Sequence, residues 1–222
     1  MNIKLLDRTG LRAAAIAAKT CIGRADDGKD MNAGEVAGFL KRAILQTGHE
    51  SVLEHVVYVF SVEGLSRACL QQLARHRHIS LSVKSTRWAL EKHGDYYTPP
   101  AFGDDFIGKE DFKADAESAI RNAREMMRSY GNDVAKYLLP ECITTDLILT
   151  VNLRELRHVY RLRTGRTAML EFQHLAKALV ACLPEDEQEL VRYRSDALER
   201  AVIEYLETGT DEARARMEAL VE

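Results

Sequence analysis

The sequence predicts an α+β fold, in which the strands of a sheet are interspersed with amphipathic helices. Two runs, 56–60 and 143–151, are rich in β-branched and aromatic residues or in Thr, Ile and Val, which is typical of strands. Around them, apolar residues recur every three or four positions, as in helices that bury one face. No repeat, low-complexity tract or linker divides the 222 residues, so residues 1–222 are expected to form a single domain.

The first half is expected to begin with a short strand and to continue mainly as helices. Its expected elements are, in order, strand 2–7, helix 11–18, a turn-rich segment 23–29, a helical face 36–44 ended by Gly48, strand 56–60 and helix 65–74. The triplet Arg75-His76-Arg77 is expected to close the last helix, and a hydroxyl-rich loop should follow it. Residues 96–98 are predicted as a strand that Pro99 and Pro100 stop.

The second half is predicted to be mostly helical, with one central strand. Its expected elements are helix 109–130, strand 143–151, helix 152–161 and helix 167–182. Residues 185–222 should form an acidic helical tail broken at Pro184 and Gly209. This tail has twelve acidic and five basic side chains although the net charge of the chain is only −3, so the preceding residues are net positive. Such focused charge favours a small anionic ligand over a nucleic-acid polymer.

The cysteines and the apolar runs exclude several classes of protein. Cys21, Cys69, Cys142 and Cys182 are widely spaced, with no CxxC pair and no histidine at metal-ligand spacing, so neither a metal centre nor a disulfide framework is predicted. Each is expected to be a small buried side chain and not a nucleophile. The amino terminus lacks the apolar core of a signal peptide, and no run approaches about 20 apolar residues, so we expect a cytoplasmic protein without membrane spans.

The strongest functional feature is the basic segment from Arg75 to Arg87. It contains four full cationic groups and two imidazoles, and no acidic residue occurs between Glu63 and Glu91. Guanidinium groups bind phosphate or carboxylate oxygens through two hydrogen bonds, so the segment predicts a phosphate site. Two simpler explanations remain, namely a solvated basic face and stabilisation of a helix end by cations.

Two further segments have unusual polar content. From Arg154 to Arg166 there are five arginines and one acid, Glu155, which indicates a second anion-binding patch. The segment 48–55 contains two histidines and two glutamates just before a predicted strand, but their spacing differs from that of a helical HExxH zinc site. No metal is therefore predicted there.

Four segments together resemble the flavin-dependent thymidylate synthases, over roughly residues 2–185. The main one is Arg75-His76-Arg77 followed after seven residues by Ser85, with Arg87 two residues later. The others are Gly48-His49-Glu50-Ser51 through Glu54-His55, Leu138-Leu139-Pro140 with Thr145, and Thr150-Val151-Asn152-Leu153-Arg154 with Arg163. The resemblance implies a mixed or antiparallel sheet flanked by helices, assembled as a homotetramer whose active sites draw residues from several subunits.

The resemblance also implies which residues bind each ligand. FAD would be held by His49, Ser51, Glu54, Arg75, His76, Arg77, His78, Asn152, Arg154 and His158. The nucleotide dUMP would be held by Gln72, Arg75, Ser85, Thr86 and Arg87, with Lys136 and Arg163 contributed by another subunit. NADPH would reduce the flavin, methylenetetrahydrofolate would donate the carbon, and Arg163 would act catalytically on the uracil ring.

Two positions depart from the family pattern. Ser82-Val83 stands where family members usually have Asn-Glu, and valine cannot accept a hydrogen bond from a nucleotide sugar. Lys136 replaces a usual arginine, which keeps the charge and loses the planar fork. The departures leave open a related flavoenzyme that modifies another pyrimidine nucleotide or adds a hydroxymethyl group. A non-enzymatic anion- or RNA-binding module is a further alternative, but residues 64–87 contain no aromatic residue on which bases could stack.

Overall fold

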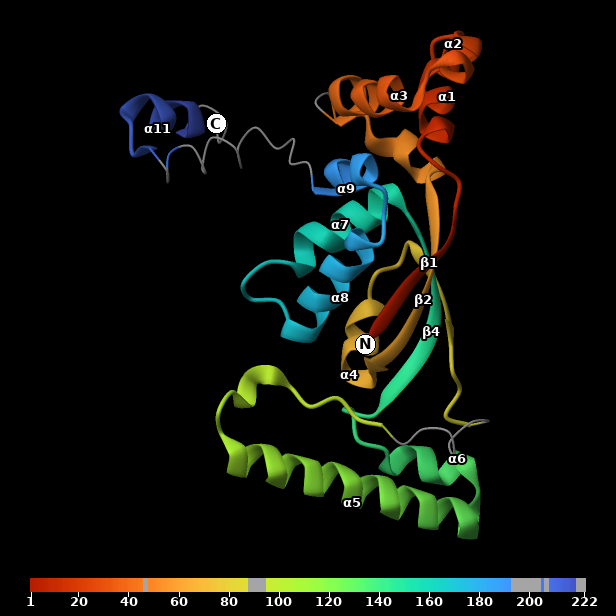
Figure 1. The fold of residues 1–222 in the computed structure, drawn as a ribbon, viewed down its shortest axis with the longest axis vertical. Coiled ribbons are helices and arrows are strands. Elements are labelled where there is room, and N and C mark those ends of the chain that lie inside the picture. Colours follow the sequence, from red (N-terminus) through yellow and green to blue (C-terminus); the bar gives the residue numbers. More distant parts are fainter. Residues whose placement is uncertain (46–47, 88–94, 193–204, 206–207, 219–222) are drawn as a thin grey trace.

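A computed structural model of the protein describes residues 1–45, 48–87, 95–192, 205 and 208–218 (Figure 1). Its centre is an antiparallel sheet with the strand order β1-β2-β4-β3. The strands are β1 (Asn2–Arg8), β2 (Val57–Ser66), β3 (Ile79–Val83) and β4 (Thr144–Asn152). The predicted α+β class, with an antiparallel sheet flanked by helices, is therefore confirmed.

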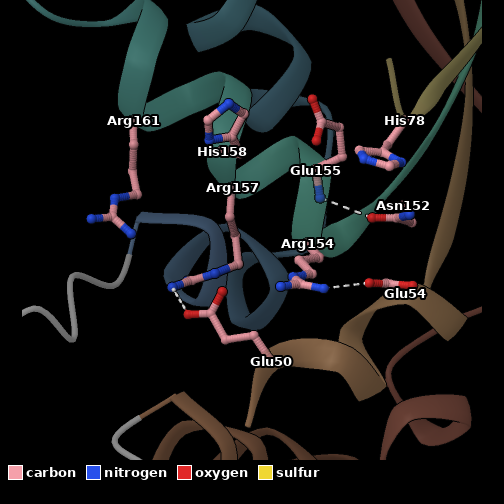
Figure 2. A pocket seen from close by; sticks show the side chains of 9 residues that line it. All are labelled: Glu50, Glu54, His78, Asn152, Arg154, Glu155, Arg157, His158 and Arg161. Atoms are coloured by element: carbon pink, nitrogen blue, oxygen red, sulfur yellow. Dashed lines mark hydrogen bonds and ion pairs between the residues drawn. The ribbon is translucent and has the colours of Figure 1, made fainter. Parts of the chain in front are cut away.

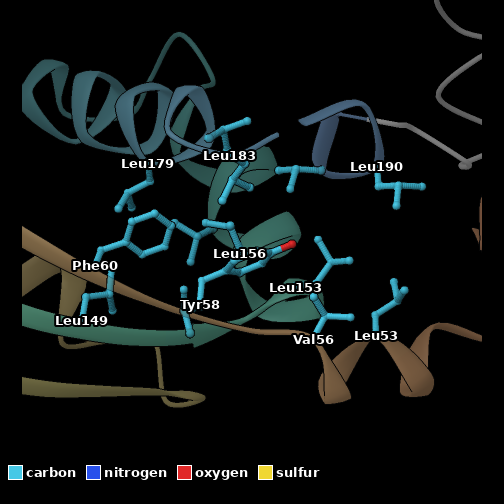
Figure 3. Packing of buried hydrophobic residues seen from close by; sticks show 14 of the residues in the cluster. Leu53, Val56, Tyr58, Phe60, Leu149, Leu153, Leu156, Leu179, Leu183 and Leu190 are labelled. Carbon is cyan, nitrogen blue, oxygen red and sulfur yellow. The ribbon is translucent and has the colours of Figure 1, made fainter. Parts of the chain in front are cut away.

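The main core lies between the sheet and the helices that cover one of its faces. These helices are α4 (Arg67–Leu73), α7 (Leu153–Arg163), α8 (Leu170–Ala181) and α9 (Glu185–Arg192) (Figure 1). Alternate residues of β2 and β4 point toward them, and Tyr58, Phe60 and Leu149 are buried against Leu156 and Leu179 (Figure 3). Burying each such side chain contributes about 1.5–3 kcal/mol, so this core fixes α7 against the sheet.

A helical unit lies beside the sheet at the amino-terminal end of the chain. It comprises α1 (Arg12–Thr20), α2 (Ala25–Asp30), α3 (Ala33–Phe39), the π-helix η1 (Leu40–Leu45) and the 3-10 helix η2 (Glu50–His55). Residues 25–30 form a helix where turns were predicted. Lys29 donates a hydrogen bond to Asp26 at 2.8 Å, and buried Gly28 packs so closely on α1 that a Cβ atom would lie 2.9 Å from Ile16 Cα. Glycine thus permits this close helix packing.

The expectation of a hydroxyl-rich loop after α4 was wrong, because residues 79–83 form strand β3. Ile79, Leu81 and Val83 pack against the core, whereas Ser80 and Ser82 are exposed. This alternation is the pattern of a half-buried strand. Helix α4 ends at Leu73, so the triplet 75–77 follows the helix and does not close it.

The middle of the chain forms an arm at one end of the sheet. It comprises η4 (Pro100–Phe102), the long helix α5 (Phe106–Tyr130), α6 (Asn132–Ala135) and η5 (Lys136–Leu138) (Figure 1). The predicted strand 96–98 is a single isolated bridge between Tyr96 and Ile143. Pro99 and Pro100 follow at once, and neither has an N–H group to extend a ladder. The long charged helix is confirmed, with Ala116, Ile120 and Ala123 on its buried side.

The carboxyl-terminal tail is helical where the structure describes it. Helix α9 begins after Pro184, and α11 (Asp211–Glu218) begins after Gly209. The remaining parts of the predicted tail, 193–204, 206–207 and 219–222, lie outside the described residues. Among the helices that can be described, none has both the length and the apolar composition required to cross a membrane.

Candidate active site

A group of contacting side chains, here called the His76 cluster, joins α4 and the loop after it to α7 and α8. It consists of Gln72, His76, Glu155, Arg163 and Phe172. The Arg163 Nε atom donates to His76 Nε2 at 3.1 Å, and Arg163 Nη1 donates to Gln72 Oε1 at 3.4 Å. The guanidinium carbon also lies 4.7 Å from the centre of the Phe172 ring, which is cation–π geometry. Arg163 is therefore held along one edge and one face.

The second nitrogen of His76 contacts a buried carboxylate. Nδ1 of His76 lies 3.0 Å from Glu155 Oε1, and both side chains are nearly inaccessible to water. Burial lowers the pKa of His76 below its ordinary value of 6.5, and the nearby Arg163 and His158 act in the same direction, while Glu155 opposes them. The imidazole is accordingly neutral at neutral pH.

The same neighbourhood contains a group of potential metal ligands. Ligand atoms of His76, Glu155 and His158 lie within 4.8 Å of one another. However, both ring nitrogens of His76 already have partners, and Arg163 can only donate hydrogen bonds. A metal at Nδ1 would place the imidazole proton on Nε2, facing the Arg163 N–H. The geometry therefore favours a hydrogen-bonded cluster, and the absence of a metal remains a prediction.

A cavity of about 470 Å³ opens beside this cluster, between α7, η2 and the start of β3 (Figure 2). Its lining side chains are all polar or charged: Glu50, Glu54, His78, Asn152, Arg154, Glu155, Arg157, His158 and Arg161. Two ion pairs order its wall, Arg154 Nη1 with Glu54 Oε1 at 2.5 Å and Arg157 Nη2 with Glu50 Oε1 at 3.2 Å. Asn152 Oδ1 accepts from the Glu155 N–H at 2.8 Å and so caps α7 at the cavity.

A second basic group, here called the Arg87 cluster, lies between the segment after β3 and the arm. Asp133 links its two cations, with Oδ2 lying 3.2 Å from Arg87 Nη2 and Oδ1 lying 3.2 Å from Lys136 Nζ. Ser85 Oγ accepts from the Arg87 N–H at 3.2 Å, which folds the chain into a tight turn. Thr86 lies between them and is half-buried.

The structure places most of the sequence-predicted residues in the cavity lining, the His76 cluster or the Arg87 cluster. Of the residues predicted to bind FAD, five line the cavity: Glu54, His78, Asn152, Arg154 and His158. The His76 ring packs edge-on against that of His158, whereas His49, Ser51, Arg75 and Arg77 are exposed and outside the lining. Six of the seven residues predicted to bind dUMP are gathered in two groups, Gln72 with Arg163 and Ser85 with Thr86, Arg87 and Lys136. The seventh, Arg75, is exposed and belongs to neither group.

Several residues of these sites were missed in the sequence. Glu155 and Phe172 contact His76 and Arg163, Asp133 joins the two cations of the Arg87 cluster, and Glu50 holds Arg157. One signal was available for Glu155, because it is the single acid among the five arginines of 154–166. A single acid among several arginines indicates a specific partner. For Glu155 this partner is His76, which lies in another segment.

Comparisons with known proteins find related sequences and a similar fold. Residues 4–185 match the family model described as thymidylate synthase complementing protein. A flavin-dependent thymidylate synthase of Campylobacter jejuni is 37% identical over 195 residues, covering 84% of this chain and 93% of that protein. One from Wolinella succinogenes is 35% identical, covering 86% of this chain and 97% of that protein. The structure is also similar to that of thymidylate synthase X from Helicobacter pylori with FAD and dUMP, with a TM-score of 0.72, 32% identity, and coverage of 86% and 98% of the two chains.

Proposed function

Since the chain belongs to the flavin-dependent thymidylate synthase family, we propose that it converts dUMP to dTMP with methylenetetrahydrofolate as carbon donor and NADPH as reductant of FAD. The observation that carries this proposal is the fixed guanidinium of Arg163, whose Nε and one Nη1 hydrogen are used by His76 and Gln72. The remaining N–H groups of its fork are available to a planar substrate. They can donate to the carbonyl oxygens at the edge of a uracil ring.

The chemistry of the cavity fits an FAD site. Three arginines, two histidines and an asparagine supply hydrogen-bond donors for a diphosphate and for polar ring edges. We propose that Glu54, His78, Asn152, Arg154 and His158 hold the cofactor together with His49, Ser51, Arg75 and Arg77. His76, predicted with them, has both ring nitrogens bonded to Glu155 and Arg163, so it would support the site through its contact with the His158 ring. Three glutamates in the lining balance the three arginines, so the exposed Arg75 and Arg77 would supply the additional positive charge. When bound, FAD supplies the hydride that completes the methyl group.

The nucleotide is proposed to contact both basic clusters. Arg163 and Gln72 would bind the uracil ring, and Arg75 would add positive charge beside them. The phosphate would bind to Ser85, Thr86, Arg87 and Lys136. Asp133 supports this assignment. Its carboxylate oxygens lie 3.2 Å from Arg87 Nη2 and 3.2 Å from Lys136 Nζ, and phosphate oxygens could contact the same two cations at similar distances.

Assembly as a homotetramer with shared sites is part of the proposal. Within one chain, however, Arg163 bonds to Gln72, and Asp133 joins Lys136 to Arg87, so Arg163 and Lys136 would act with these residues of their own chain and not complete the site of another copy. Large apolar side chains flank both residues at the surface. Tyr137 and Leu138, directly after Lys136, are 82% and 44% exposed, and Leu162, directly before Arg163, is 52% exposed. Apolar surface adjoining polar ligand groups is expected at an interface between subunits.

The decisive experiment is reconstitution. Purified protein incubated with FAD should be yellow, and its flavin absorbance should bleach on addition of NADPH. Adding dUMP and methylenetetrahydrofolate should then yield dTMP, which mass spectrometry distinguishes from a hydroxymethyl product. Failure to bind flavin, or absence of dTMP with flavin bound, would reject the proposal.

A second candidate, favoured by Val83, is the same chemistry on a different pyrimidine nucleotide. Val83 is half-buried and packs against the core, so its apolar side chain offers no acceptor to a sugar hydroxyl. Supplying UMP in place of dUMP tests this candidate in the same assay. Salt-sensitive RNA binding by flavin-free protein would instead favour the non-enzymatic alternative.

The proposed chemistry predicts that the cysteines are dispensable. Burial raises the pKa of Cys69, Cys142 and Cys182, so each remains a protonated, weakly nucleophilic thiol at neutral pH. We expect Cys69→Ala, Cys142→Ala and Cys182→Ala to keep at least half of the rate of dTMP formation, measured per bound flavin. Loss of turnover in a folded Cys142→Ala protein would contradict this. Burial was expected for each cysteine, but only Cys69 is buried, Cys142 and Cys182 are partly buried, and Cys21 is exposed.

A further inference from the structure

The hydrogen bonds of His76 with Arg163 and Glu155 show where the proton of His76 resides. An arginine side chain carries donors only and stays charged at all working pH values. Because Arg163 Nε donates to His76 Nε2, this nitrogen must present its lone pair. The proton of the neutral imidazole therefore lies on Nδ1, from which it is donated to Glu155 Oε1 at 3.0 Å. Glu155, His76 and Arg163 form a continuous chain of hydrogen bonds.

The carboxylate at the end of this chain is held in place. Glu155 is 8% exposed and His76 is 5% exposed, so water has little access to their contact. Glu155 lies in the first turn of α7, whose N–H at that residue is bonded to the Asn152 side chain (Figure 2). Phe172 packs edge-on against the His76 ring and also lies under the Arg163 guanidinium. This packing restricts rotation of the His76 ring, and the low exposure keeps water from replacing the contact between His76 and Glu155.

We propose that Glu155 is a positioning residue for the reaction: it fixes the Nδ1–H tautomer of His76, which then holds the Arg163 fork toward the uracil ring. This inference rests on the proposed function for the role of Arg163. It adds Glu155, which lines the proposed FAD cavity but was not among the predicted ligand-binding residues, and it assigns His76 an acceptor role toward Arg163. The Nε2–H tautomer would place two N–H donors against each other and release Arg163.

The arrangement has a consequence for the dependence of activity on pH. Protonation of His76 puts hydrogens on both nitrogens and so breaks the contact with Arg163 Nε. Within the described part of the chain, the charged or titratable groups that face His76 are Glu155, His158 and Arg163, all on α7, while α8 presents the apolar Phe172. Glu155 is the one that raises the pKa of His76. Removing its negative charge should therefore move the acid limb of the kcat profile to lower pH.

Two variants of Glu155 separate positioning from a general structural effect. Glu155→Ala removes the acceptor, and we expect kcat for dTMP formation to fall about 10–100-fold with flavin retained, by analogy with residues that orient the histidines of metal sites. Glu155→Gln keeps an acceptor oxygen and loses the charge. We expect it to keep kcat within about threefold at its plateau but to shift the acid limb downward. Glu187→Gln, a matched buried carboxylate that pairs with Arg8, should leave the acid limb unchanged.

The chain of contacts is tested directly in two ways. If Glu155 acts through Arg163, then Glu155→Ala should cause no further loss in an Arg163→Lys background. Nitrogen-15 NMR of labelled histidine should show the Nδ1–H tautomer for His76 and its loss in Glu155→Ala. The NMR measurement needs no turnover, so it stands even if the wild-type protein forms no dTMP. The inference would be overturned by any of three results. These are losses in kcat that multiply fully in the Glu155→Ala, Arg163→Lys double variant, an unshifted acid limb in Glu155→Gln, or an Nε2–H tautomer of His76 in the wild type.

Discussion

Arg163→Lys is expected to lose most thymidylate formation while keeping its flavin, its NADPH oxidation and its thermal stability. Activating the uracil ring for attack on a one-carbon electrophile requires negative charge to build on its amide-like edge. A guanidinium fixed against that edge stabilises the charge as it develops. Loss of one preorganised donor raises the barrier by about 3–4 kcal/mol, which corresponds to a rate lower by about a few hundredfold.

The geometry explains why lysine should not replace this arginine. Arg163 uses Nε for His76 and Nη1 for Gln72 and stacks on Phe172, so three separate features of the planar group are engaged. An ammonium keeps the charge but has one nitrogen and no flat face. The simpler role, in which Arg163 stabilises the end of α7 before Gly165, needs only the charge.

The rate of dTMP formation per bound flavin, measured at saturating dUMP, decides between these roles. Arg166→Lys is a suitable control, because Arg166 is an exposed arginine just beyond the same helix. It should behave as the wild type. Near-normal product formation by Arg163→Lys would leave the helix-end role and exclude the catalytic one.

The second large effect is expected at the flavin site. Arg77→Ala and His49→Ala should each weaken FAD binding by about 10–200-fold, because a charge-assisted or polar hydrogen bond to a phosphate is worth about 1.5–3 kcal/mol. Arg77 and His49 are both exposed, and His49 makes no side-chain cap bond to η2. Neither substitution removes core volume, so the free energy of unfolding should change by less than about 0.5 kcal/mol.

Flavin absorbance after gel filtration, together with urea unfolding, measures both parts of this prediction. Arg128→Ala removes a comparable charge from the exposed side of α5, and no residue of α5 lines the cavity. This variant should therefore retain FAD. Stoichiometric flavin in both Arg77→Ala and His49→Ala would place the cofactor elsewhere. Loss of flavin with loss of folding would show that the two residues support the structure.

The sequence was sufficient for most elements because periodicity reports which face is buried. The strands at 2–7, 56–60 and 143–151 and the helix 109–130 lie where their patterns predicted. Strand β3 was missed because its serines were interpreted as a loop, although Ile79, Leu81 and Val83 alternate with them. The expected strand at 96–98 failed for a different reason, because the two prolines leave no donors for pairing.

By itself, the sequence determined the α+β class, the two basic segments and the residues that resemble a flavin-dependent synthase. Only the tertiary structure decided how those residues meet. It linked Arg163 to His76 and Glu155, and it joined Arg87 to Lys136 through Asp133. Composition and spacing report charge and burial along one chain, whereas hydrogen bonds depend on distances of about 3 Å between atoms from distant segments. Those distances are set by the packing of α4, α7 and α8 on the sheet, which no local pattern encodes.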